Sequence, residues 1–256
     1  MKMVLVFLLT VLLVATATSA EAYRYEMMRP GQIRDAIDRG VPLLIPTGVL
    51  EYHGPHNPIG VDALIAQGIA HRVAKEAECV VAPTVFYGYT GRWGGGVKEG
   101  EIHIEGGELY PFVRPMIKAF YDQGWKRIYI ILHHQGATGV TWITYQRVAT
   151  ELAMEEGHRL GGDGWSEAEN LPTNIWSRIR VVSDSQFSNK GYGGHGGKGE
   201  TMAMMFLYPE TVNLSELAKA DKLPRWAKDA DQADPKEAEE IGKAIIGGWI
   251  KEISKK

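Results

Sequence analysis

The sequence has little cysteine, no surplus of charge of either sign and only one long apolar run. One cysteine in 256 residues excludes an internal disulfide, and 28 basic against 31 acidic residues leave a net charge of -3. Nucleic-acid recognition usually requires a basic excess, so we expect no nucleic-acid partner. The 45% hydrophobic content is too high for a disordered chain. We therefore expect a packed globular protein with a small molecule as its partner.

The long apolar run lies at the N-terminus. Lys2 precedes it, and the small residues of ATATSAEA follow it. A charged start, a short apolar segment and a small-residue cleavage point are typical of a secretory signal peptide. A spanning helix needs ~20 apolar residues, so an uncleaved anchor is the weaker alternative. We expect residues 1–22 to be a signal peptide, cleaved after Ala20 or Ala22. Residues 23–256 would then form one exported domain, periplasmic or secreted, with no stable membrane span.

Short apolar runs alternate with amphipathic stretches along the rest of the chain, a pattern typical of βαβ units. Buried strands are expected at residues 41–46, 80–85, 127–132 and 179–182. Helices are expected at residues 108–122, 140–156, 200–207 and 235–253. Another helix is expected to begin at Asp62, whose side chain would cap it. The order predicts an α/β fold with a parallel sheet. The polar loop 161–174 is expected to be a solvated excursion, with a lid or a subunit contact as the alternative.

The lone cysteine is expected to be structural. Cys79 opens the apolar stretch CVVAP, and Glu78 before it would raise the pKa of the thiol. A thiol with a raised pKa is a poor nucleophile, because little thiolate forms near neutral pH. The sequence also lacks the G-x-S-x-G elbow of many serine hydrolases. These observations disfavour a serine or cysteine hydrolase.

Histidines and carboxylates gather in three segments that follow predicted strands, and sites in open α/β sheets form at that end of the strands. In the first segment, EYHGPHNPIGVD, Glu51 and His53 are two residues apart. An extended chain would place both side chains on one face. Asp62 lies far enough along the chain to return across the mouth of the site. Two carboxylates and an imidazole are ligands that suit Zn or Mn.

The second and third segments are ILHHQGATG and GHGGKGET. His133 and His134 are adjacent and point in different directions, so at most one of them is expected to be a ligand. His195 and Glu200 are separated by a glycine-rich turn, which allows close backbone approach to a ligand. Together the three segments offer two histidines and three carboxylates as ligands, with His195 to spare. That set is sufficient for two metal ions bridged by an aspartate.

The three segments resemble the signature motifs of the creatininase (creatinine amidohydrolase) family. TGVLEYHGPHNPIGVD is similar to G-S-x-E-x-H-G-P-H-x-P followed by Asp, HHQGA to G-H-G-G-N, and HGGKGET to H-A-G-x-x-E-T. The resemblance runs from about Leu43 to Leu214. It implies a three-layer α/β/α sandwich with a mostly parallel central sheet, a metal-dependent amidohydrolase and a homo-oligomer, often a hexamer.

The resemblance also implies roles for individual residues. The implied metal ligands are Glu51, His53, Asp62, His134 and Glu200. They would hold two divalent ions, Zn and/or Mn with Fe as an alternative, and Asp62 would bridge them. His195 would be the acid/base residue. His56 is expected either to orient a ligand or to stabilise a turn, and no role is expected for His133 or His103.

Two departures from the family pattern leave the substrate open. In HHQGA, His133, Gln135 and Ala137 replace the first Gly, the second Gly and the Asn of the motif, and GGGVKEGEIHIEGG replaces the common F-P-G-T stretch. The predicted function is an exported amidohydrolase that cleaves a C–N bond of a small cyclic amide or formamide with a metal-activated water. The alternative is an exported metal-containing binding protein without turnover.

Overall fold

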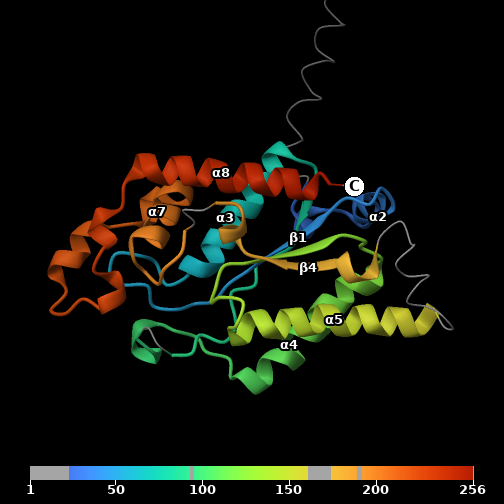
Figure 1. Cartoon of the computed structure of the whole chain (residues 1–256), viewed down its shortest axis with the longest axis horizontal. Helices are drawn as coiled ribbons and strands as arrows, with labels where there is room; N and C mark the ends of the chain where they lie inside the picture. Colours follow the sequence, from blue (N-terminus) through green and yellow to red (C-terminus); the bar gives the residue numbers. More distant parts are fainter. Residues whose placement is uncertain (1–22, 93–94, 161–173, 189–191, 256) are drawn as a thin grey trace, which may run out of the picture.

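A parallel sheet forms the centre of the computed structural model, which describes residues 23–92, 95–160, 174–188 and 192–255 (Figure 1). Its strands are β1 (Leu43–Thr47), β2 (Val80–Val81), β3 (Ile128–Leu132) and β4 (Ile179–Val182). They are ordered β2-β1-β3-β4, and every neighbouring pair is parallel. The strands consist almost entirely of buried apolar residues, as expected for a parallel sheet that is covered on both faces.

In the described ranges, three helices pack on each face of this sheet. The helices α3 (Val61–Glu76), α7 (Lys198–Leu207) and α8 (Pro235–Ile253) cover one face, at the top of Figure 1. The helices α2 (Pro30–Asp38), α4 (Gly106–Gln123) and α5 (Val140–Leu160) pack against the other face. The 3-10 helices are Tyr25–Met27, Val97–Glu99, Ile175–Ser177, Asp184–Gln186, Pro209–Thr211, Leu214–Lys219, Arg225–Ala227 and Ala230–Gln232. The predicted three-layer α/β/α sandwich is confirmed.

Alternation along each strand divides the core into two apolar layers. Leu44 of β1 and Ile131 of β3 point toward α3, α7 and α8. Leu43 and Ile45, on either side of Leu44, point toward α2, α4 and α5. Successive side chains of a strand project to opposite faces, so a five-residue strand can supply both layers. Cys79 lies in the first layer, and burial and the charge of Glu78 raise the pKa of its thiol to about 12.

Two local expectations are wrong. The strand predicted at 80–85 is only two residues long, because the chain leaves the sheet after Val81 and returns to β1 only in a single bridge between Val85 and Thr47. Asp62 does not cap its helix: α3 begins at Val61 after Gly60, and no side chain caps it. Histidines compete for the Asp62 carboxylate, and they hold it in the site described below.

Several expectations concern residues outside the described ranges. They include the predicted signal peptide at 1–22 and nearly all of the predicted loop 161–174. None of the helices in the described part of the chain combines the length and the apolar character that a membrane span needs.

Close packing at the end of β1 positions the site. Gly48 follows this strand, and a Cβ atom at Gly48 would lie 2.2 Å from the backbone nitrogen of Ala63. Only glycine therefore lets the strand end approach the first turn of α3 so closely. This contact brings Asp62, on α3, beside Glu51, which follows β1.

Candidate metal centre

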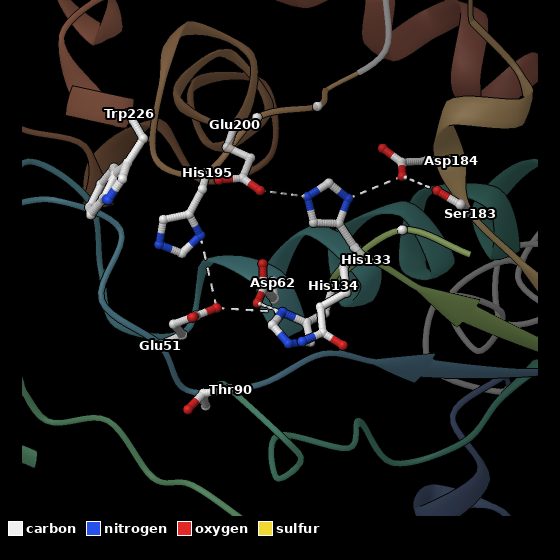
Figure 2. Close-up of a pocket in the computed structure, with 14 residues that line it drawn as sticks. Glu51, Asp62, Thr90, His133, His134, Ser183, Asp184, His195, Glu200 and Trp226 are labelled. Carbon is white, nitrogen blue, oxygen red and sulfur yellow. Dashed lines mark hydrogen bonds and ion pairs between the residues drawn. The ribbon is translucent and has the colours of Figure 1, made fainter. Parts of the chain in front are cut away.

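A cavity of about 490 Å³ opens at the carboxyl ends of the strands. It is lined by side chains that follow β1, β3 and β4 and by the start of α7, the edge at which parallel α/β sheets form their sites. Figure 2 shows His195 and Trp226 on one side of this cavity and His133 and Asp184 on the other, with Asp62 between them. The structure brings together all six predicted site residues: Glu51, His53, Asp62, His134, His195 and Glu200.

Glu51, Asp62 and His134 form a first group of possible ligands, whose atoms all lie within 4.8 Å of one another. His134 Nδ1 lies 2.7 Å from Asp62 Oδ2 and 3.5 Å from Glu51 Oε2. On its other side, His134 Nε2–H donates to the carbonyl oxygen of Tyr89 at 2.8 Å. This backbone bond fixes the ring and turns Nδ1 toward the two carboxylates, as is usual for metal-binding histidines.

His53, Asp62 and Glu200 form a second group with the same spacing. His53 Nδ1–H donates to the carbonyl oxygen of Glu51 at 2.8 Å, so its Nε2 faces the carboxylates. Nε2 lies 3.2 Å from Asp62 Oδ1 and 3.4 Å from Glu200 Oε2. It is buried and forms no hydrogen bond in the described part of the protein. Asp62 thus offers Oδ1 to the second group and Oδ2 to the first.

These two groups fit divalent cations. In each, an imidazole nitrogen whose partner nitrogen already donates to a backbone carbonyl points at two carboxylates. A neutral imidazole would direct a lone pair at those negative oxygens, so a cation belongs between them. Buried charges that lack such compensation are strongly destabilising. Oxygen and imidazole nitrogen donors suit Zn and Mn.

Without a metal, bound protons supply part of the positive charge that the buried carboxylates require. Burial and the neighbouring Asp62 carboxylate raise the pKa of Glu51 to about 7. Burial opposes the protonation of His53, but Asp62 and Glu200 outweigh it and raise its pKa to about 10. For Asp62, burial is outweighed by the imidazoles of His53 and His134, which lower its pKa. A bound cation would replace protons on these groups.

His195 stands at the edge of the site and is its most solvent-accessible histidine. Its Nε2–H donates to the carbonyl oxygen of Tyr52 at 2.9 Å, and its Nδ1 lies 3.9 Å from Glu51 Oε2. Burial and the charge of His53 lower the pKa of His195, which favours the neutral ring. The edge contact with Trp226, at a centroid distance of 4.5 Å, holds the ring on its other side. His195 also forms a third group of possible ligands with Glu51 and His53.

His56 and His133 are two further buried histidines near the candidate ligands. His56 Nε2 lies 2.9 Å from the hydroxyl of Thr201, the residue after Glu200, so it connects the first segment to α7. Burial and the charge of His53 lower the pKa of His56 to about 4. No role was expected for His133, but the structure places it in the wall of the cavity. There it is buried between Asp184 and Glu200.

Three further cavity residues, Thr90, Asp184 and Trp226, were not anticipated. Asp184 is the second residue after β4, so the rule that selected the residues after β1 and β3 would also have selected it. Trp226 lies in the short helix Arg225–Ala227, which no strand or motif signal marks. Its place beside His195 depends on the packing of the chain that follows α7.

A family model described as Creatininase: Creatinine amidohydrolase matches residues 26–252. The chain belongs to the creatininase family. Family members are metal-dependent amidohydrolases, so the predicted enzyme class, a metal-dependent hydrolase, is confirmed. The resemblance stated from the motifs is confirmed as well.

Two curated relatives have the same percentage of sequence identity to this creatininase-family chain. The creatinine amidohydrolase of Pseudomonas putida is 27% identical over 184 residues, which cover 68% of this chain and 67% of that protein. The 3-dehydro-scyllo-inosose hydrolase of Thermotoga maritima is 27% identical over 125 residues, which cover 49% of this chain and only 40% of that protein.

Solved creatininase structures share the fold. A crystal structure of creatinine amidohydrolase (creatininase) superposes with a TM-score of 0.68 at 20% identity and covers 90% of this chain and 96% of that one. A manganese form of creatininase has a TM-score of 0.67 at 21% identity, covering 90% of this chain and 97% of its own. A Zn-Zn type has a TM-score of 0.67 at 20% identity, covering 90% and 96%.

Proposed function

We propose that this creatininase-family chain is an exported amidohydrolase that cleaves a C–N bond of a small cyclic amide or formamide with a metal-activated water. One observation carries the proposal: Asp62 takes part in two groups of possible metal ligands, one through each carboxylate oxygen. A carboxylate shared in this way can hold two ions close together. Two-metal sites of this kind are suited to hydrolysis.

We propose two divalent ions, Zn and/or Mn with Fe as the alternative. Glu51, Asp62 and His134 would hold one ion, and His53, Asp62 and Glu200 the other. When bound, such ions lower the pKa of a coordinated water and polarise the carbonyl of an amide. The manganese and Zn-Zn forms among the structural relatives support this choice of metals.

His195 is proposed to move the proton. Its ring is fixed by the Tyr52 carbonyl, and Nδ1 faces the cavity on the side of Glu51, 3.9 Å from Oε2. A neutral imidazole there can take a proton from the attacking water and deliver it to the departing nitrogen. Amide and water thus become a carboxylic acid and an amine, and His195 returns to its starting state. Trp226, which meets Tyr52 edge to face, lines the cavity on this side.

The cavity size supports a small substrate. A volume of about 490 Å³ lies within the range of small-molecule sites. One structural relative is a mutant creatininase complexed with creatine, with a TM-score of 0.68 at 21% identity. The two curated relatives are named for different substrates, creatinine and 3-dehydro-scyllo-inosose. The amide substrate therefore rests on the family and on the motif resemblance.

Metal-dependent turnover tests this function. Protein purified after expression of the full chain would be offered creatinine-like rings, lactams and formamides, before and after chelation and with Zn or Mn added back. We expect turnover of at least one amide that disappears with the chelator and returns with metal. A protein that contains and binds no divalent ion and hydrolyses no amide would overturn the proposal. Two bound ions without any turnover would favour the binding-protein alternative.

We also propose export and self-association. The charged, apolar and small-residue pattern of residues 1–22 supports a cleaved signal peptide, and the motif resemblance supports a homo-oligomer, with a hexamer as one form. Sequencing the N-terminus of the exported protein should give Glu21 or Tyr23 as the first residue. Light scattering coupled to size exclusion should give a multiple of the chain mass. Retention of Met1, or a monomer, would contradict the respective proposal.

A further inference from the structure

Asp184, His133 and Glu200 form a row of charged side chains along one wall of the cavity (Figure 2). His133 follows β3, Asp184 follows the neighbouring strand β4, and Glu200 lies in the first turn of α7. All three residues are buried. Three separate elements therefore converge on one histidine that stands next to the candidate metal centre without belonging to either ligand group.

The two oxygens of Glu200 have different surroundings. Oε2 accepts a hydrogen bond from the backbone nitrogen of Gly196 at 2.6 Å and lies 3.4 Å from His53 Nε2, on the side of the second ligand group. Oε1 lies 3.4 Å from His133 Nε2. A turn of the Glu200 carboxylate would thus break the contact with His133 and move Oε2 away from His53.

Asp184 in turn orients His133. His133 Nδ1–H donates to Asp184 Oδ1 at 3.0 Å, which directs Nε2 at Glu200. Asp184 Oδ1 also accepts a hydrogen bond from the Ser183 hydroxyl at 3.3 Å, and Oδ2 is buried with no hydrogen-bond partner among the described residues. His133 is the ion-pair partner of Asp184 in the described part of the chain. Each member of the pair depends on the other. By contrast, the ligand histidines His53 and His134 are held by backbone carbonyls.

We propose that His133 and Asp184 are positioning residues that hold Glu200 for the second ion, the one assigned to His53, Asp62 and Glu200. The inference rests on the proposed metal centre and concerns how its two positions differ. His133 precedes His134 of the first ion position in the chain, but among the described residues the side-chain hydrogen bonds and ion pairs of His133 go to Asp184 and Glu200. The motif that HHQGA resembles has glycine in place of His133, so this support is a feature of the present chain.

The proposal predicts an asymmetric loss of metal. Outer partners of metal ligands typically contribute 10- to 100-fold in affinity. In His133→Gly, and more mildly in Asp184→Asn, we expect the affinity for one ion to fall by about 10-fold or more while the other ion stays bound. His133→Gln should restore much of the loss, because its amide nitrogen can take the place of Nε2 beside Glu200.

The experiment combines graded chelation with metal analysis and electron paramagnetic resonance of the Mn-loaded protein. Wild type should release two ions at similar chelator strength and show a coupled Mn pair. His133→Gly should release one ion early and then show the spectrum of a single Mn ion. Glu252→Gln, which removes a buried carboxylate contacting Arg180 and Lys255, is the control and should behave as wild type. Melting of the metal-free variants reports any general damage.

Three outcomes would overturn the inference. The first is wild-type affinity for both ions in His133→Gly and Asp184→Asn. The second is an equal decrease in the affinity for both ions that parallels a decrease in the melting temperature of the metal-free variants, which would indicate a merely structural role. The third is a wild-type protein that binds no ion. This third result removes the proposed function as well, whereas the first two leave the two-metal centre intact.

Discussion

Two regions of the described structure that bury carboxylates differ in the cations that those carboxylates meet. On α8, Glu252 contacts the guanidinium of Arg180 and lies 2.7 Å from the ammonium of Lys255. In the cavity, the ion-pair partners of Glu51, Asp62 and Glu200 among the described residues are imidazoles. Both regions bury negative charge, but only the first supplies permanently charged partners.

The difference appears in the ionisation of the two regions. Burial opposes the ionisation of Glu252, yet Lys255 and Arg180 outweigh it and lower its pKa. For Glu51, burial and the charge of Asp62 prevail over the imidazoles and raise the pKa to about 7. The carboxylates on α8 are satisfied without help, whereas those in the cavity need added protons or metal ions. A cluster of carboxylates that faces histidines is therefore the region suited to reversible cation binding.

The largest expected effect comes from Asp62→Asn. An amide cannot bridge two cations as a carboxylate does, so both ions should be lost together and turnover should fall by more than about 100-fold, beyond what outer partners contribute. Metal analysis and turnover measure this. Glu252→Gln, on the other side of the comparison, should keep both ions. Retention of one tightly bound ion in Asp62→Asn would show that Asp62 serves a single position.

Replacement of His195 by alanine should have the next largest effect and should separate chemistry from metal binding. Loss of a general acid/base typically costs about 10²- to 10⁴-fold in rate. We expect a loss of that size in kcat, with two ions still bound, as checked by steady-state kinetics and metal analysis. If His195→Ala lost an ion as well, His195 would belong to the ligand set that it forms with Glu51 and His53.

Without bound metal, the titratable groups of the cavity should make the free energy of unfolding depend on pH. The pKa of folded Glu51 is raised from 4.5 to about 7, and that of His53 from 6.5 to about 10. The folded state binds the protons of these two groups more tightly, so the stability that they contribute is fully present at low pH and is lost as the pH rises through these values. The urea concentration at the midpoint of unfolding of the metal-free protein should decrease as the pH rises from 7 to 10. Bound metal should make this decrease smaller. The same decline with and without metal would contradict this expectation.

Glu252→Gln should have the smallest effect of the four. It removes one charge from contacts whose Arg180 and Lys255 side chains are largely exposed, so we expect a loss of about 1–2 kcal/mol in the free energy of unfolding. Urea denaturation measures the loss, and turnover should not change. A change in metal content would mean that the two regions are coupled.

The sequence was sufficient to predict the parts of the fold and site that follow local patterns. Apolar runs marked β3 and β4, and the helix predicted at 235–253 has the bounds of α8. Residues after strand ends were expected to converge because parallel strands end at one edge, and Glu51 and His134 do meet Asp62 there. Their roles as ligands stay predictions.

Other parts depend on tertiary contacts that no local pattern encodes. Asp62 has the sequence position of a helix cap, but His53 and His134 compete for its carboxylate. His133 is adjacent to the predicted ligand His134 and was given no role, because the sequence does not show that its ring lies between Asp184 and Glu200. Trp226 reaches His195 only through the packing of an irregular segment.

Anomalous diffraction from crystals of the Zn-loaded protein would test the shared role of Asp62, because it locates each ion relative to this carboxylate. We expect two anomalous peaks per chain. One should contact Asp62 Oδ1 together with His53 and Glu200, and the other Asp62 Oδ2 together with Glu51 and His134. A single peak, or peaks that do not share Asp62, would rule out a two-metal centre bridged by Asp62.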